Sequence, residues 1–231
     1  MRLITRFLTF FFHHLYHGLA FIYDAIAGMV SFGQWNEWTK TTLPFLTGTR
    51  ILELGHGPGH LQHNILQSLQ TLESPSAQNV KSRDFTSPLE SFVVGLDESS
   101  QMSRLARKRL HRSGYTQPNL TRGLGQFLPF ATESFDSLVA TFPAPYIAEA
   151  QTLSEARRVL RNGGRLIVLP AAWPKNPILK WLYHFTGESP AEGIDILKEK
   201  SVSLLARAGF TVKVEIVEVK SAELLLIVAI K

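Results

Sequence analysis

The chain has 231 residues, 45% of them apolar, which is enough for one substantial hydrophobic core and a single domain with an appendage. It has no cysteine, which excludes disulfides, thiolate zinc sites and cysteine nucleophiles and fits a reducing, cytoplasmic location. The net charge of +5 suggests attraction to anionic surfaces, but over most of the chain Lys and Arg are scattered among acids.

The first thirty or so residues are unusually apolar and aromatic, which raises the question of a signal peptide or a membrane span. No small-residue cleavage site closes the run. Asp24 at the centre of a bilayer would cost on the order of several kcal/mol. Neither interpretation fits the sequence well.

At helical spacing, the polar residues of this segment fall on one narrow stripe, which predicts a helix with a thin polar edge. The stripe contains Arg2, Arg6, His13, His17, Asp24 and Ser31. His13 and His17 would share a helix face, but no third ligand accompanies them, so we predict no metal site. We expect the segment 1–47 to be either a lid that packs on the domain and closes a pocket or an interfacial helix at a membrane surface.

A glycine-rich turn follows a short apolar run. Ile51 to Leu54 predicts a buried strand, and a helical pattern runs from about Leu61 to Leu72. Between them lie Gly55, Gly57 and Gly59, which allow positive φ and close approach of a ligand to the backbone. The turn therefore predicts a nucleotide-sized ligand, although many nucleotide-binding folds share it.

A second apolar strand, Phe92 to Leu96, ends in Asp97. A carboxylate at this place can accept two hydrogen bonds from the hydroxyls of a ribose. In the plain dinucleotide fold the acid comes roughly 20 residues after the glycines, and here it comes later. The polar insertion 73–91, which we expect at the surface, accounts for the excess. The alternative is that Asp97 caps the next helix.

The densest basic cluster follows Asp97 on a predicted helix. Its members are Arg104, Arg107, Lys108, Arg109, His111 and Arg112. With Met102, Leu105 and Leu110 on the apolar side, the cluster is most simply a solvated helix face, and we predict no nucleic-acid partner.

The rest of the chain alternates strands and helices. Strands are predicted at Leu120–Gly123, Ser137–Phe142 and Arg165–Leu169, and helices at Ile147–Arg161 and Ile194–Ala208. Asn162-Gly163-Gly164 would end the first helix in a left-handed C-cap. The runs Thr211–Val219 and Leu224–Ile230 are joined by a link too short for a helical crossover, so they must pair antiparallel. The predicted fold is α/β: a doubly wound, Rossmann-like, mostly parallel seven-stranded sheet with a C-terminal antiparallel hairpin, plus N-terminal apolar helices.

Four segments in this order resemble the class I S-adenosylmethionine (SAM)-dependent methyltransferases, and most closely the ubiquinone and menaquinone biosynthesis subgroup (methyltransferase type 11). They are Leu52–Gly59, Gly95–Met102, Leu128–Pro129–Phe130 with Ser134–Phe135–Asp136, and Glu155–Gly164. The resemblance implies a methyltransferase domain at 48–231 and SAM as the cofactor.

By this resemblance, Glu53, Gly55, Gly57 and Gly59 would surround the amino-acid part of the cofactor, and Asp97 would hold its ribose. Met102 would lie against the adenine. Gln126 and Phe127 stand where the family often has Asp-Ala, and Gln126 is a candidate contact of the adenine amino group. Tyr23 and Asp24 are similar to a Tyr-Asp pair of this subgroup, in which the tyrosine approaches the cofactor.

The acceptor side is less defined. Thr141 to Tyr146 stands where amino-directed methyltransferases carry Asn-Pro-Pro-Tyr, but Phe142 and Ala144 depart from that pattern, so we predict no N-methylating site and assign Tyr146 to the pocket wall. The aromatic segment 171–190, with Trp181 and His184, would meet the N-terminal helix over the ligand crevice. We therefore expect a small, hydrophobic, lipid-like or quinone-like acceptor. His184 and His17 are candidate bases, and no catalytic residue is assigned.

Two other function classes remain open at this point. One is an NAD(P)-dependent Rossmann oxidoreductase, although His60 replaces the third glycine of that fingerprint and the antiparallel ending is foreign to it. The other is a non-catalytic, cofactor-binding or membrane-associated module. We expect a cytoplasmic protein with a small-molecule partner, with the N-terminal helix as its contact if it is peripheral to a membrane.

Overall fold

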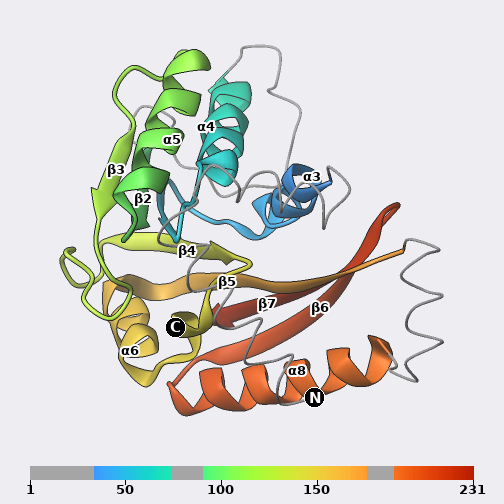
Figure 1. The fold of residues 1–231 in the computed structure, drawn as a ribbon. Coiled ribbons are helices and arrows are strands. Elements are labelled where there is room, and N and C mark those ends of the chain that lie inside the picture. The colour runs from blue at the N-terminus through green and yellow to red at the C-terminus, as the bar shows by residue number, and fades with distance from the viewer. Residues whose placement is uncertain (1–33, 74–90, 176–189) are drawn as a thin grey trace.

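The computed structural model describes residues 34–73, 91–175 and 190–231 (Figure 1). The helical elements are α3 (Trp35–Lys40), η1 (Leu43–Phe45), α4 (His60–Glu73), α5 (Ser100–Arg112), η4 (Pro145–Ala148), α6 (Ala150–Val159) and α8 (Pro190–Arg207). The strands are β1 (Arg50–Leu54), β2 (Phe92–Asp97), β3 (Asn119–Arg122), β4 (Phe135–Thr141), β5 (Leu160–Pro174), β6 (Thr211–Val219) and β7 (Ala222–Ile230).

The strands form one seven-stranded sheet of order β3-β2-β1-β4-β5-β7-β6. The first five are parallel, whereas β7 pairs antiparallel with both β5 and β6. The turn from β6 to β7 is the dipeptide Lys220-Ser221, which permits only the antiparallel arrangement. The predicted fold class is confirmed.

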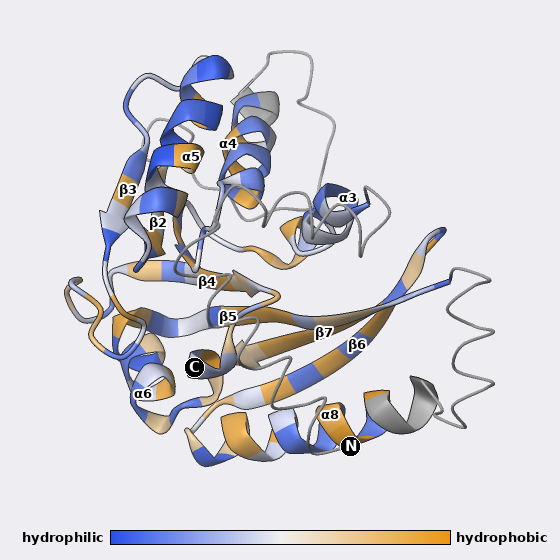
Figure 2. Ribbon diagram, in the orientation of Figure 1, coloured by the Kyte–Doolittle hydropathy of each residue, from blue (hydrophilic) through white to orange (hydrophobic). Residues whose placement is uncertain are grey.

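Helices cover both faces of the sheet, as side-chain alternation along β1 requires. Ile51 belongs to a buried cluster with Leu61 and Ile65 of α4, and the next residue, Leu52, belongs to a second cluster with Leu153 of α6. Figure 1 shows α3, α4 and α5 on one side of the sheet and α6 and α8 on the other. The ribbon of α5 is mainly hydrophilic (Figure 2), because only one side of this helix packs on the sheet.

The predicted C-cap at Asn162-Gly163-Gly164 is wrong. Helix α6 ends at Val159, and Leu160 is already extended and pairs with Phe135 of β4. Gly163 does adopt a positive φ of 76°, but it does so within β5. Its N–H donates to the Lys231 carbonyl, so pairing with the end of the chain takes the place of a helix cap.

Strand β5 is also longer than the predicted run Arg165–Leu169. Its last residues, Ala171 to Pro174, pair with β7 and therefore turn the beginning of the predicted aromatic segment 171–190 into sheet. Several predictions lie outside the described residues. These are the N-terminal apolar helices, the insertion 73–91 apart from its ends, and the site candidates Tyr23, Trp181 and His184 with the stripe residues His13 and His17.

Candidate cofactor site

The glycine turn connects β1 to α4 at the carboxyl end of the sheet, and its glycines serve different purposes. Gly59 has φ 81°, and a Cβ placed there would lie 2.9 Å from the Ala106 Cβ, so glycine allows α5 to pack directly on the turn. Gly57 has φ 50°, and a Cβ there would meet no atom of the described residues within 4 Å. Only the open side at Gly57 leaves room for a ligand beside the backbone.

Asp97 joins the end of β2 to this turn. Its Oδ2 accepts a hydrogen bond from the Gly57 N–H at 2.9 Å, and its Oδ1 accepts one from the Ser99 N–H at 2.8 Å. The residue is only 4% exposed. Each carboxylate oxygen keeps a second lone pair, so a further hydroxyl donor fits the chemistry of the group.

Helix α5 fastens the turn from the other side. Ser99 is its N-cap and accepts from the Met102 N–H at 3.2 Å. Further along, the Arg109 guanidinium donates to the Pro58 carbonyl within the turn. Met102 itself is buried on the inner side of α5, so its contact with an adenine stays a prediction.

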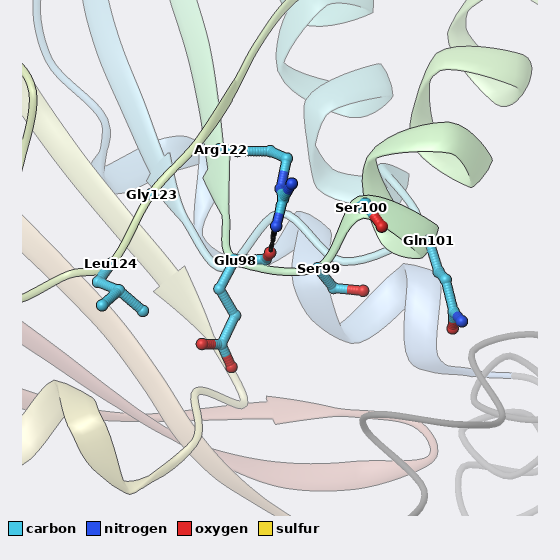
Figure 3. Close-up of a pocket in the computed structure, with 7 residues that line it drawn as sticks. All are labelled: Glu98, Ser99, Ser100, Gln101, Arg122, Gly123 and Leu124. Atoms are coloured by element: carbon cyan, nitrogen blue, oxygen red, sulfur yellow. Dashed lines mark hydrogen bonds between the residues drawn. The ribbon is translucent and has the colours of Figure 1, made fainter.

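A cavity of about 620 Å³ opens beside this junction (Figure 3). It is lined by Glu98, Ser99, Ser100, Gln101, Arg122, Gly123 and Leu124. The Arg122 Nε and Nη2 donate to the Glu98 carbonyl at 3.3 and 3.1 Å and hold the chain there, while the Glu98 side chain extends away from that contact (Figure 3). The volume is typical of small-molecule and cofactor sites.

The loop that follows the cavity-lining residues Gly123 and Leu124 is held by a charged clamp on α6. Glu155 accepts from the Leu128 N–H at 2.9 Å, and Arg158 donates to the carbonyls of Leu128 and Phe130 at 3.0 and 2.8 Å. Glu155 and Arg158 also pair with each other at 2.7 Å. Two of the four sequence segments are therefore one structural unit, which fixes the wall of the cavity.

Gln126 and Phe127 lie in that loop. The Gln126 amide nitrogen donates to Glu149 Oε2 at 2.8 Å, which leaves its carbonyl oxygen as an acceptor for an amino group. Phe127 is 69% exposed, and Leu124 is 46% exposed. The assignments of Gln126 and Phe127 as cofactor contacts stay predictions.

Tyr146, from η4, spans the space between this loop and the glycine turn. A Cβ at Gly55 would lie 2.8 Å from the Tyr146 hydroxyl oxygen, and a Cβ at Gly125 would lie 2.9 Å from its ring. The ring therefore lies at the carboxyl end of the sheet, and its assignment to a pocket wall stays a prediction.

Glu53 is buried under the glycine turn, with 2% of its surface exposed. Burial raises its pKa well above the ordinary range, the nearby Asp97 charge adds to the rise, and hydrogen bonding from Gln62 offsets part of it. The Oε2 atom has no hydrogen-bond partner in the described part of the chain. Such an atom is a ready acceptor for a cationic donor.

His56 is a site residue that the sequence reasoning missed. Its Nδ1–H donates to the Gly57 carbonyl at 2.7 Å, and its ring packs against the position of Gly95 on β2. Burial lowers its pKa, and the Asp97 charge opposes this shift. The signal in the sequence that could have pointed to His56 was the residue type. A bulky ring within a glycine turn needs space against a neighbouring strand.

An aromatic pair lies at the end of β4. Phe142 has a positive φ of 47°, a conformation that costs roughly 1–3 kcal/mol and is found mostly where the surrounding structure enforces it. The Phe142 N–H donates to the Leu169 carbonyl at 2.7 Å. The centroid of the Phe142 ring lies 4.2 Å from that of the Trp35 ring. Sequence reasoning did not predict the conformation of Phe142.

These features fit a SAM-sized ligand. The open side at Gly57 admits its amino-acid part, the unpaired oxygen of Glu53 suits an ammonium group, and the cavity beside Asp97 has room for an adenosine. Among the described residues no group of three His, Cys, Asp or Glu side chains comes together as a metal site would need. Within the described ranges, no helix has the length and apolar character needed to cross a membrane.

A sheet of this order, with β7 reversed and a glycine turn after β1, defines the class I methyltransferase fold. Solved structures agree. A SAM-dependent methyltransferase from Aquifex aeolicus matches with a TM-score of 0.56 and 15% identity over 85% of this chain and 92% of that one. A Haemonchus contortus phosphoethanolamine N-methyltransferase, in complex with S-adenosylhomocysteine, matches with a TM-score of 0.55 and 14% identity over 86% of this chain and 53% of that one.

The sequence comparisons identify the family. The model of the ubiE/COQ5 methyltransferase family matches residues 9–197, and the chain belongs to this family. A ubiquinone/menaquinone biosynthesis C-methyltransferase UbiE from Geotalea daltonii is 27% identical over 71% of this chain and 64% of its own length. A demethylmenaquinone methyltransferase from Symbiobacterium thermophilum is 30% identical over 72% of this chain and 61% of its own length. The chain thus spans a little under two thirds of these relatives.

Proposed function

We propose that this protein transfers a methyl group from SAM to a small, hydrophobic, quinone-like acceptor. Family membership supports the reaction class, and two relatives are named for quinone methylation. The hydrophobic character of the acceptor is inferred from the pair Trp35 and Phe142. Their ring centroids lie 4.2 Å apart next to the carboxyl end of β4. An aromatic wall suits a planar, apolar ring better than a polar metabolite.

The proposed cofactor contacts follow the geometry of the turn. Asp97 would accept from the ribose hydroxyls, and Glu53 would accept from the ammonium of the amino-acid part. Gln126 would use its carbonyl oxygen for the adenine amino group. The chemistry that the cofactor supplies when bound is an electrophilic methyl group on a sulfonium.

The protein's own contribution is to place the acceptor in line with that methyl and to exclude water. Phe142 and Trp35 supply an apolar wall, and Tyr146 brings a hydroxyl next to Gly55. A phenol group there can hydrogen-bond an oxygen of the acceptor ring and fix its orientation. The transfer leaves S-adenosylhomocysteine and requires the acceptor to lose one proton, which would pass from its hydroxyl to solvent; no side chain is assigned as the base, and positioning can supply much of the acceleration.

We also propose the domain division expected from the sequence, with 1–47 as a lid or membrane-facing segment over a methyltransferase domain at 48–231. The contact between Trp35 and Phe142 supports it, because it brings the last part of the N-terminal segment to the end of β4. In this arrangement an apolar acceptor would reach the site from the side of a membrane.

A turnover assay with methyl-labelled SAM tests the proposal. A detergent extract of membrane lipids and a short-chain demethylated quinol should accept label, and Phe142→Ala should reduce this turnover with little effect on SAM affinity. The matched variant Phe130→Ala removes a ring away from the proposed acceptor wall. Label appearing only in polar, soluble metabolites would overturn the acceptor class.

Calorimetry with SAM and NAD separates the other function classes. Tight binding of SAM and none of NAD is expected, because the described turn lacks the third glycine of the nicotinamide fingerprint. SAM binding without turnover on a broad acceptor panel would instead favour a non-catalytic module.

A further inference from the structure

We propose that the exposed face of α5 is a docking surface for membranes that contain anionic lipids. This basic face consists of Arg104, Arg107, Lys108, His111 and Arg112, all exposed. The proposal rests on the proposed function in one respect only, namely that an acceptor of the quinone type resides in a membrane.

The sequence around the basic face contains no counter-charge. Between Glu98 and Glu133 every charged residue is a Lys or an Arg. The neighbouring helix α4, which lies alongside α5 in Figure 1, adds no carboxylate between His60 and Gln70. Glu73, the last residue of α4, is the one acid of the two helices, and among the side chains that the structure describes no carboxylate of α4 or α5 offsets the positive field of this surface.

The basic face also differs from several other arginines of the described structure in how its side chains are used. Arg50 donates to the Ser134 carbonyl, Arg161 pairs with Asp136, and Arg158 holds the loop at Leu128. In the described part of the chain, no ion pair or hydrogen bond joins a side chain of the basic face to another residue. These cations are available to an external partner.

The face is rigid and continuous with the cavity rim. Met102, Ala106 and Leu110 on the opposite side of α5 are buried, so binding would not have to order the helix. Gln101 lines the cavity, and Arg104 follows it by three residues on the same side of the helix. A membrane against the basic face would thus lie beside the entrance of the site.

A membrane fits this surface better than a nucleic acid. A helix that reads a groove has to protrude, whereas α5 packs beside α4 on the same side of the sheet (Figure 1). The exposed face carries no aromatic residue on which a base could stack. Binding to anionic lipid headgroups requires only several cations on one accessible face.

Vesicle co-sedimentation of the full chain tests the proposal. Binding to vesicles with about 30% phosphatidylglycerol should exceed binding to pure phosphatidylcholine, and the excess should disappear between about 50 and about 500 mM NaCl. The double variant Arg104→Glu/Lys108→Glu should weaken the salt-sensitive binding by at least about tenfold.

The control is Lys198→Glu/Lys200→Glu, which makes the same change of net charge at exposed residues of α8. It should bind like the wild type, and thermal unfolding should show that both variants fold. Equal salt-sensitive binding by the α5 variant and the wild type would overturn the proposal, as would tighter binding of a DNA duplex than of the anionic vesicles. SAM calorimetry on the same samples keeps the two proposals apart, since a chain that binds vesicles through α5 but no SAM would refute only the proposed function.

Discussion

The Asp97 carboxylate accepts a hydrogen bond from the Gly57 N–H at 2.9 Å, although the two residues are 40 positions apart. This contact links two of the sequence segments that carry the family resemblance. One oxygen fixes the glycine turn, and the other fixes the first turn of α5 through Ser99. The acid thus sets the position of both elements that border the cavity.

Asp97→Ala is expected to weaken SAM binding by at least about 100-fold, because it removes both the proposed ribose acceptor and the anchor of the turn. It should also lower the free energy of unfolding by roughly 1–3 kcal/mol, since two backbone N–H groups lose their acceptor. Calorimetry with S-adenosylhomocysteine and urea unfolding measure the two effects. Glu215→Gln is the control at an exposed carboxylate of β6 that does not line the cavity, and unchanged affinity in Asp97→Ala would refute the ribose assignment.

The variants Gly57→Ala and Gly59→Ala distinguish a glycine that leaves room for the ligand from a glycine that allows helix packing. Alanine at Gly57 meets open space, so the fold should lose only the roughly 1–2 kcal/mol of a left-handed residue, while SAM binding should fall sharply. Alanine at Gly59 adds a contact of 2.9 Å with Ala106 and should destabilise the fold further by displacing α5. Urea midpoints and calorimetry on both variants test this, and equal loss of stability in the two would contradict it.

Arg158→Ala should reduce both stability and cofactor binding. It removes the donor to two loop carbonyls and the partner of Glu155, with an expected cost of about 2–3 kcal/mol. The hydrogen bond from Arg158 lowers the pKa of Glu155, so the Glu155 carboxyl loses its proton more readily in the folded state than in the unfolded chain. The stability that the Glu155–Arg158 pair contributes should therefore be lost as pH falls below the ordinary glutamate range.

The neighbouring Arg157→Ala is the matched control for this prediction. Arg157 makes one exposed hydrogen bond of 3.4 Å to the Gly209 carbonyl, so its loss should change stability by less than about 0.5 kcal/mol. Urea unfolding between neutral and acid pH compares the two variants. If they lost the same stability, the clamp would not hold the loop.

The sequence predicted the fold well because its signals were local. Ile51 to Leu54, the glycines and the short link before β7 each fix a strand, a turn or a pairing direction within a few residues. The end of α6 was mispredicted for the opposite reason. Gly163 has the left-handed conformation of a cap, but its partner is Lys231, and a contact across so much of the chain leaves no local pattern.

Only the part of the candidate site that lies within sequence motifs could be predicted. The glycines and Asp97 were assigned from their residue types and their places after the first two strands, and these assignments stay predictions, whereas the burial of His56 against Gly95 depends on the register between β1 and β2. The same holds for Phe142, whose positive φ follows from its bond to Leu169 on β5. Residues whose roles arise from neighbouring strands could not be assigned before the sheet was known.

Glu53→Gln is expected to stabilise the fold and weaken the cofactor site. Because burial raises the pKa of Glu53, the folded state keeps this proton at a pH where the unfolded chain has released it. The folded state then binds more protons, so the free energy of unfolding falls as pH rises from the ordinary glutamate range to the raised pKa. At neutral pH the neutral glutamine should therefore raise the free energy of unfolding.

The same substitution should weaken SAM binding by about 10- to 100-fold, because an ammonium group would lose its charged acceptor. If Glu53 meets that ammonium, SAM binding by the wild type should release a proton, since a positive charge favours the ionised carboxyl. Calorimetry in two buffers of different ionisation enthalpy measures this release, which should be absent in Glu53→Gln. The exposed Glu37→Gln is the control and should leave stability, affinity and proton release as in the wild type. A wild type that binds SAM without releasing a proton would show that Glu53 is a structural acid and that the ammonium lies elsewhere.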